Sequence, residues 1–203
     1  MKNILPIILI VGFFFLIWSH NDYNKKLENI RNETEIRVDS LQTHIDSLNR
    51  DINTLEEYLD SLPLGSPLDT LVISSNYGWR KLPMYGGWRM HSGTDFFAAW
   101  SDTVYATGNG LVTNVGWNFG YGRQIKIEHC GDYYSSYSHL YRFLVKSGDS
   151  VTLGQPIARA GNSGMVTGPH LHYEISRWDK KMDPISLLSY SLTRFSVSPT
   201  SSQ

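Results

Sequence analysis

A regular spacing of apolar residues in the first third of the chain constrains its folding more than any other feature. Apolar side chains recur there at alternating intervals of three and four residues, at Val38, Leu41, Ile45, Leu48, Ile52, Leu55, Leu59 and Leu62. This is the a/d heptad period of a coiled coil. Most a positions are β-branched and every d position is leucine, which favours a parallel two-stranded assembly. We predict a coiled coil over residues 20–62 that forms a homodimer. The alternative is a helix that packs on its own domain or on a partner protein.

An apolar run precedes this helix. Residues 4–18 carry no charged side chain. At about 1.5 Å per residue the run spans about 22 Å, less than the roughly 30 Å core of a bilayer. We predict that residues 1–19 form an N-terminal membrane anchor, with a transmembrane part at about residues 4–19 under modest mismatch. A cleaved signal peptide is the alternative, but the residues after Trp18 offer no small-residue cleavage site.

The pattern changes after residue 62. Pro63 and Pro67 frame a short linker over residues 63–67 that ends the helix. Short β-rich runs separated by glycine-rich turns follow, and they predict an all-β domain over residues 68–188. These runs are Thr70–Ile73, Gly110–Trp117, Arg123–Glu128, Asp132–Ser138, Gln155–Ala160 and His170–Ser176. Residues 189–203 are rich in serine and threonine, and we predict that this tail is disordered.

Charge separates the two regions. Residues 20–62 hold ten acidic and five basic side chains, a net charge of -5, whereas residues 63–190 hold eleven basic and nine acidic ones, a net charge of +2. The second value is too small to indicate binding to nucleic acid. The single Cys130 excludes an intrachain disulfide.

Four histidines and one aspartate carry the strongest chemical signal: His91, Asp95, His139, His170 and His172. His170 and His172 are two apart in a β-rich run, so their imidazoles point to the same face. The spacing of four between His91 and Asp95 also places them on one face of a strand. His139 ends an aromatic run, which puts it at a predicted strand end. Zinc catalysis needs three imidazole or carboxylate ligands and a water, so this set has two groups more than a metal requires.

Several short motifs surround these residues. They are Tyr77-Gly-Trp-Arg80, His91-Ser-Gly-Thr-Asp95, Tyr137-Ser-His-Leu140, Gly148-Asp-Ser-Val-Thr-Leu-Gly154 and the run from Gly161 to Glu174. Their order and spacing over about half of the chain resemble the M23 family of zinc metallopeptidases, the lysostaphin-type or LytM-type peptidoglycan endopeptidases. The resemblance implies a compact antiparallel β-sheet domain with an active-site groove across its face.

The resemblance also implies roles for single residues. His91, Asp95 and His172 match the zinc ligands, whereas His139 and His170 match the two histidines that move protons. The resemblance does not say which of those two is the base. Arg80, in the Tyr-Gly-Trp-Arg motif, is a candidate for substrate binding, and a structural pairing with a carboxylate is its alternative.

These expectations combine into one functional hypothesis. The chain is expected to be a zinc metalloendopeptidase that hydrolyses peptide bonds of bacterial peptidoglycan, in cross-links or stem peptides. It would act in the cell envelope, held by a single-pass anchor with the peptidase domain on the outer side. The alternative is a non-catalytic LytM-type activator or scaffold of another wall hydrolase that acts through its coiled coil. The complete set of five residues favours the enzyme.

Overall fold

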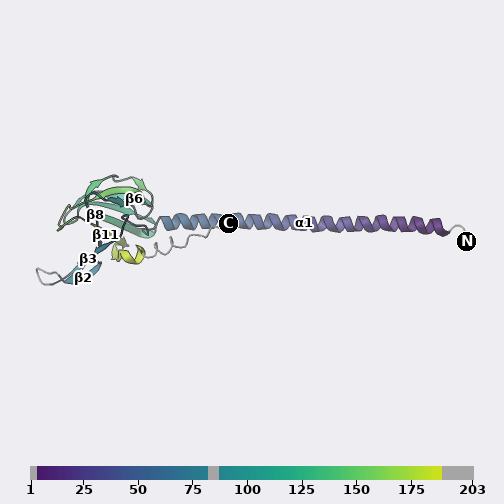
Figure 1. The fold of residues 1–203 in the computed structure, drawn as a ribbon, viewed down its shortest axis with the longest axis horizontal. Helices are drawn as coiled ribbons and strands as arrows, with labels where there is room; N and C mark the ends of the chain where they lie inside the picture. The colour runs from purple at the N-terminus through teal and green to yellow at the C-terminus, as the bar shows by residue number, and fades with distance from the viewer. Residues whose placement is uncertain (1–3, 82–86, 189–203) are drawn as a thin grey trace. The chain divides into compact units, whose positions relative to one another are not determined.

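The computed structural model describes residues 4–81 and 87–188 of the chain. Contacts divide the chain into two compact units, Met1–Thr54 and Leu55–Gln203. One long helix begins in the first unit, and the strands belong to the second (Figure 1). The predicted disordered tail, residues 189–203, lies outside the described residues.

Helix α1 runs from Ile4 to Asp60 without a break. It therefore continues through the boundary predicted at residue 19. The apolar heptad side chains are largely exposed in the single chain, with Val38 and Leu41 each 62% and Leu55 61% exposed. The pairing of these side chains in a coiled coil stays a prediction. The helix ends shortly before Pro63, which has no N–H to continue the helical hydrogen bonds.

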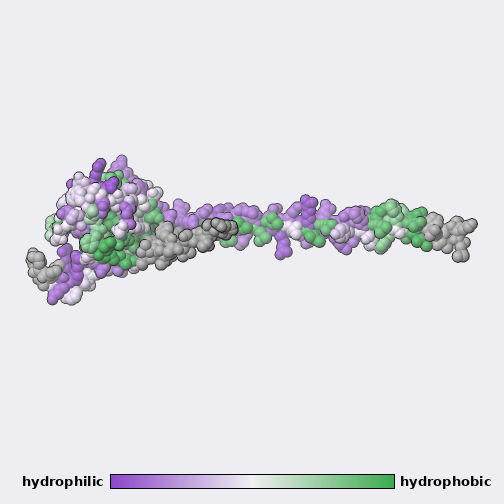
Figure 2. Space-filling view, in the orientation of Figure 1, coloured by the Kyte–Doolittle hydropathy of each residue, from purple (hydrophilic) through white to green (hydrophobic). Residues whose placement is uncertain are grey.

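The apolar run at the start of α1 is shorter than a membrane span. Figure 2 shows hydrophobic side chains gathered in this part of the helix. Among the described residues, no helix is both long and apolar enough to cross a membrane. The prediction of a transmembrane segment at about residues 4–19 is therefore not supported.

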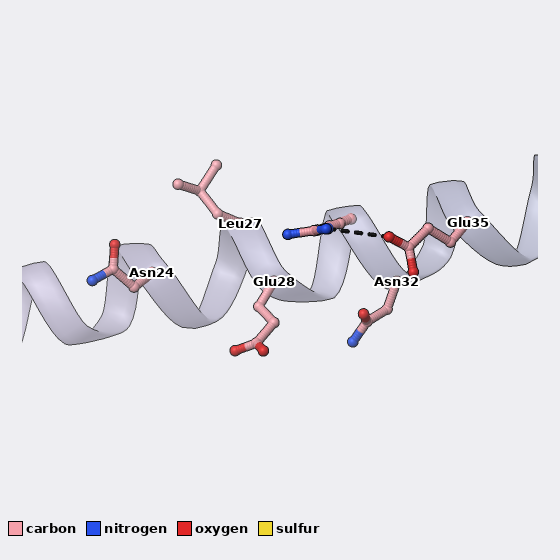
Figure 3. Close-up of a pocket in the computed structure, with 6 residues that line it drawn as sticks. Asn24, Leu27, Glu28, Asn32 and Glu35 are labelled. Atoms are coloured by element: carbon pink, nitrogen blue, oxygen red, sulfur yellow. Dashed lines mark hydrogen bonds and ion pairs between the residues drawn. The ribbon is translucent and has the colours of Figure 1, made fainter.

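A shallow pocket lies along one face of α1 in the first unit. Its lining consists of Asn24, Leu27, Glu28, Arg31, Asn32 and Glu35. The guanidinium of Arg31 lies 3.1 Å from the carboxylate of Glu35 (Figure 3). Both side chains are exposed and four residues apart, as is usual for ion pairs on a helix surface. We assign no chemical function to this pocket.

The segment after α1 packs into the β unit. The backbone N–H of Asn109 donates to the carbonyl of Asp60 at 2.7 Å, and that of Gly65 donates to the carbonyl of Thr107 at 2.7 Å. Leu64 is only 7% exposed. Residues 63–67, predicted as a linker, are therefore mostly buried against the loop that contains Thr107.

The β unit is built on a ten-stranded antiparallel sheet with the path β1-β4-β11-β8-β7-β6-β9. Beside this path β10 pairs with β5 and β8, and β12 pairs with β11; β2 and β3 form a separate two-stranded sheet (Figure 1). The predicted all-β antiparallel domain is confirmed. The strands are β1 (Ile73–Ser75), β2 (Gly78–Lys81), β3 (Trp88–His91), β4 (Thr94–Phe97), β5 (Thr103–Tyr105), β6 (Gly110–Asn118), β7 (Gly122–Glu128), β8 (Tyr133–Phe143), β9 (Ser150–Val151), β10 (Pro156–Ala160), β11 (His170–Arg177) and β12 (Lys180–Met182).

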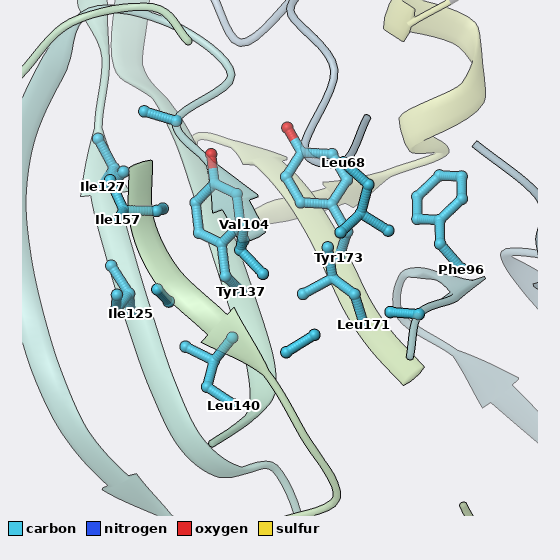
Figure 4. Packing of buried hydrophobic residues seen from close by; sticks show 14 of the residues in the cluster. Leu68, Phe96, Val104, Ile125, Ile127, Tyr137, Leu140, Ile157, Leu171 and Tyr173 are labelled. Carbon is cyan, nitrogen blue, oxygen red and sulfur yellow. The ribbon is translucent and has the colours of Figure 1, made fainter. Parts of the chain in front are cut away.

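The core lies on one face of this sheet. In β11 the alternate residues Leu171, Tyr173 and Ile175 are fully buried, as the two-residue period of a strand requires. They pack with apolar side chains of β4, β7, β8 and β10 (Figure 4). The residues between them, His170, His172 and Glu174, therefore point to the opposite face.

A polar network crosses this core. The Tyr173 hydroxyl donates to Thr107 Oγ1 at 2.8 Å, and the Thr107 N–H donates to the Tyr137 hydroxyl at 3.0 Å. The Ser135 hydroxyl lies 3.1 Å from that of Tyr137 and 2.7 Å from Nε2 of His129. His129 Nδ1 in turn donates to the carbonyl of Asn109 at 2.9 Å. Buried polar groups that are all paired in this way stabilise one arrangement of a core.

Burial makes His129 a pH-sensitive part of this network. Burial lowers the pKa of His129 from 6.5 to about 4, although the hydrogen bond to Asn109 opposes the shift. The unfolded chain therefore binds a proton below about pH 6.5 that the folded chain does not bind until about pH 4. We therefore expect the titration of His129 to lower the free energy of unfolding by about 3 kcal/mol as the pH falls from 7 to 4.

Denaturant unfolding of the wild type and of His129→Gln across this pH range measures the effect. The stability difference between the two proteins should shrink by about this amount on acidification, since glutamine does not titrate. A difference that is constant with pH would contradict the assignment.

Candidate functional site

The pairing of β4 with β11 brings the first two candidate ligands together. Asp95 and His172 are direct partners in the antiparallel register of these strands. His91 ends β3, and a two-residue turn connects it to β4. In that turn, a Cβ on Gly93 would overlap the carbonyl oxygen of Tyr173 in β11. Only glycine lets this turn approach β11 closely enough to bring His91 to the other two residues.

Three ligand atoms converge on one point. Asp95 Oδ1 lies 2.7 Å from His172 Nδ1 and 3.1 Å from His91 Nε2, and the two imidazole nitrogens are 3.1 Å apart. His91 is 7% and His172 4% exposed. The structure thus gathers His91, Asp95 and His172 into a group that can hold a metal ion.

The protons of the two imidazoles are bound elsewhere. His91 Nδ1 lies 2.7 Å from the carbonyl of Asn76, an obligate acceptor, so Nδ1 carries the proton. His172 Nε2 lies 3.2 Å from the carboxylate of Glu174 and donates to it. The remaining nitrogens therefore turn lone pairs toward Asp95. Three acceptors this close repel one another unless a cation lies among them, and two imidazoles with one carboxylate suit zinc.

The charges around the site also favour a cation. Burial alone raises the pKa of Asp95, but its close contacts with the imidazoles of His172 and His91 outweigh burial and hold the pKa well below its usual range. Burial alone lowers the pKa of His172, but the hydrogen bonds to Asp95 and Glu174 raise it above 6.5. Both shifts show that the site favours a positive charge beside Asp95, and a metal ion bound there would compete with a proton.

The remaining two histidines lie beside this group. The rings of His139 and His170 are 4.7 Å apart between centroids, and those of His139 and His172 are 5.8 Å apart. His170 Nε2 lies 3.9 Å from Asp95 Oδ1. The structure therefore brings together all five residues that the sequence analysis identified.

Both of these histidines are oriented by backbone carbonyls. His139 Nδ1 donates to the carbonyl of Ser163 at 2.8 Å, and His170 Nδ1 donates to the carbonyl of Gly168 at 2.9 Å. In each ring Nε2 is therefore the basic nitrogen. Burial lowers the pKa of His139 from 6.5 to about 4, against the opposing effect of the Ser163 carbonyl. His139 is thus neutral at physiological pH and able to accept a proton.

His139 does not sit where it was predicted. It lies inside β8 rather than at its end, with a left-handed backbone (φ 63°). The pairing of β7 with β8 shifts register next to this position. A non-glycine residue in this conformation costs about 1 kcal/mol or more and is common at functional sites. Sequence alternation alone does not reveal such an irregularity.

Arg80 lies in β2, a strand that carries none of the five residues. It is exposed in β2, opposite Arg89 of β3, and its guanidinium donates to the hydroxyl of Ser75. Its role in substrate binding stays a prediction. Trp117, near the end of β6, is 66% exposed, and Phe119, in the loop between β6 and β7, is 87% exposed.

Four further polar residues lie at the site, and none of them was predicted to contact the metal ligands: Ser92, Tyr121, Glu174 and Lys181. The Tyr121 hydroxyl lies 3.2 Å from both Ser92 Oγ and Glu174 Oε1. Glu174 had a detectable signal, because it is two residues beyond His172 and therefore on the same face of the strand. Ser92 directly follows His91 in the sequence, whereas Tyr121 and Lys181 come from other elements, and only the fold brings those two here.

Close backbone packing supports the carbonyl that orients His139. Gly122 has a left-handed backbone (φ 66°), and a Cβ there would overlap the backbone and side chain of Ser163. Gly148 has a similar backbone (φ 89°), but a Cβ there would meet nothing within 4 Å. Both glycine-to-alanine changes introduce the same backbone strain of about 1 kcal/mol. The difference between their losses of unfolding free energy therefore measures the overlap of the new Cβ with Ser163.

We expect Gly122→Ala to lose at least 1 kcal/mol more unfolding free energy than Gly148→Ala, because overlap with backbone adds to strain. It should also displace the Ser163 carbonyl and change the ¹⁵N shifts of the His139 ring, which Gly148→Ala should leave unchanged. Denaturant unfolding and ¹⁵N NMR measure the two effects. Equal losses and unchanged ring shifts would show that this packing does not orient His139.

Comparisons with known proteins agree with this geometry. Residues 89–184 match the model of Peptidase family M23. The chain is 44% identical over 112 residues to the peptidoglycan DD-endopeptidase ShyC of Vibrio cholerae, a match that covers 55% of this chain and 26% of that protein. The chain spans about a quarter of the length of the curated relatives it matches.

Solved structures share the fold. A zinc containing peptidase from Vibrio cholerae matches with a TM-score of 0.57 and 39% identity, over 59% of this chain and 38% of that one. The catalytic domain of the antimicrobial peptidase lysostaphin from Staphylococcus simulans matches with a TM-score of 0.53 and 34% identity, over 59% of this chain and 92% of that one. Because the family match spans the strands that carry all five site residues, the chain belongs to peptidase family M23.

Proposed function

We propose that this protein is a zinc-dependent endopeptidase that hydrolyses peptide bonds of bacterial peptidoglycan in the cell envelope. One observation carries the proposal: three ligand atoms converge beside two histidines whose basic nitrogens are free. The similarity to proteins named peptidoglycan DD-endopeptidases supports the peptide cross-links as substrate.

His91, Asp95 and His172 would hold the zinc ion. Their donor set is neutral imidazole and carboxylate, and three protein ligands leave a position for water or substrate. When bound, zinc supplies a Lewis acid that polarises the scissile carbonyl and lowers the pKa of a water molecule. The negative charge of Asp95 partly balances the ion.

His139 and His170 would move the protons. Each has its Nδ1 proton held by a backbone carbonyl, so Nε2 can accept a proton from the attacking water and pass it to the leaving amine. The carbonyl of Ser163 or Gly168 then stabilises the imidazolium that forms. The ring separation of 4.7 Å allows either histidine to serve the same reacting atoms.

Substrate contacts would come from exposed groups around this site. We retain Arg80 as a proposed contact, since its exposed guanidinium could pair with a carboxylate of a peptidoglycan stem peptide. Trp117 and Phe119 are exposed aromatic side chains that could pack against an extended peptide.

Two histidine variants of the full chain test the proposed roles. We expect His139→Ala to bind zinc as the wild type does but to cleave cross-linked muropeptides at least about 100-fold more slowly, as loss of a general acid or base predicts. His172→Ala should lose the metal and the activity together. His44→Ala, an exposed histidine of α1, is the control.

Mass analysis of the digests and zinc quantification give the two readouts. New amino termini that disappear on addition of a chelator would support the endopeptidase. Zinc-loaded wild-type protein that produces none would reject it in favour of the non-catalytic scaffold.

We further propose that α1 forms a parallel coiled-coil homodimer. Its exposed heptad stripe has β-branched residues at most a positions and leucine at every d position. In a parallel pair, Asp51 at position g would face Glu56 of the second copy at position e. These like charges would weaken the dimer at this point. A charge change here therefore tests whether the two helices run parallel.

We expect the full chain to be a dimer by light scattering and Leu48→Asp to shift it to monomer. Asp51→Lys should stabilise a parallel dimer at low salt by a few tenths of a kcal/mol per pair. The reason is that the lysine then faces Glu56 of the second copy. Asp46→Lys makes the same charge change at position b, off the seam, and is the control. A monomeric wild type would contradict the parallel dimer. So would equal effects of Asp51→Lys and Asp46→Lys on the dissociation constant of the dimer.

A further inference from the structure

The carboxylate of Glu174 is buried behind the proposed metal ligands. Glu174 is 2% exposed and lies on the same face of β11 as His172. Four donors from different parts of the fold surround it. They are His172 Nε2 at 3.2 Å, the Tyr121 hydroxyl at 3.2 Å, Lys181 Nζ at 2.5 Å and the hydroxyl of Ser92.

Lys181 gives this carboxylate its orientation. It extends from β12, which pairs with β11, and contacts Oε2 of Glu174. The other oxygen, Oε1, faces His172, Tyr121 and Ser92. A buried carboxylate needs a nearby positive charge and several donors to remain ionised, and this arrangement supplies both.

An ionised carboxylate accepts hydrogen bonds and donates none. His172 must therefore keep its proton on Nε2, and its Nδ1 then carries the lone pair that faces Asp95 at 2.7 Å. If the proton moved to Nδ1, it would occupy the point where the three ligand atoms converge. The identity of the group at position 174 thus decides which nitrogen of His172 is available to a metal.

We propose that Glu174, oriented by Lys181, is a positioning residue that holds His172 in the tautomer whose Nδ1 can bind the metal. The proposal rests on the metal site of the proposed function but not on cleavage of peptidoglycan. It assigns Glu174 no contact with substrate or metal.

Glu174→Gln separates this role from packing, because glutamine has nearly the same shape. Its amide group would have to turn its NH₂ either toward Lys181 or toward His172. Against Lys181 two donors would face each other, so the amide oxygen should face Lys181 and the NH₂ should face His172. The NH₂ donates to Nε2, which favours the Nδ1–H tautomer and blocks the metal site.

The double variant Glu174→Gln with Lys181→Met reverses this preference. Without the lysine, the amide oxygen can face His172 and again accept its Nε2 proton. Glu174→Asp keeps the charge and should retain part of the function. Glu128→Gln is the matched control, since Glu128 accepts a hydrogen bond from Tyr134 at 2.9 Å in the same sheet, away from the site.

The experiment measures two properties of the full-length protein. One is the ¹⁵N NMR pattern of the His172 ring in the metal-free protein, recorded in alkaline solution where the ring is neutral. The other is zinc affinity by competition with a coloured chelator. We expect Nε2–H in the wild type and Nδ1–H in Glu174→Gln, with zinc affinity about 10- to 100-fold weaker. The double variant should recover both properties, and Glu128→Gln should change neither.

The outcomes distinguish this proposal from the proposed function. A folded Glu174→Gln protein that keeps the wild-type tautomer and zinc affinity would overturn the positioning role, whatever the enzyme's activity. So would a double variant that recovers neither property while remaining folded by circular dichroism. A wild type that binds zinc with the Nε2–H tautomer but cleaves no muropeptide would reject the proposed function and leave the positioning role standing.

Discussion

The antiparallel pairing of β11 with β4 and β8 is the constraint on which the site depends. It sets His172 between Asp95 on one side and Ser138 on the other. The two-residue period of β11 then turns its apolar side chains into the core and its polar ones toward the site. Burial of one face thus holds the other face in register, since a slip of one residue would exchange the two sets.

The four imidazoles of the site are oriented in the same way. Each donates its spare N–H to an acceptor outside the point of convergence, and this choice sets which nitrogen carries the lone pair. Backbone carbonyls serve His91, His139 and His170. His172 alone uses a side chain, that of Glu174. Its orientation therefore depends on a second set of contacts, through Tyr121, Ser92 and Lys181, that reaches well beyond the strand.

Strand periodicity predicted much of the β domain. The strands now labelled β6, β7, β10 and β11 begin and end within one residue of the predicted runs, because each is an apolar run that follows a turn containing glycine. The short strands β2, β5, β9 and β12 were missed, since runs of two to four residues carry no readable period. β8 extends beyond its predicted end because its backbone continues through the irregular conformation of His139.

By itself, the sequence determined the five residues that meet at the site, the heptad stripe of α1 and the all-β class of the domain. These follow from residue type and short-range spacing, which the local geometry of strands and helices converts directly into shared faces. Only the tertiary structure decided which nitrogen of each histidine is free and how Ser92, Tyr121 and Lys181 surround Glu174. Those contacts join residues far apart in the chain, so they exist only once the sheet has closed around them.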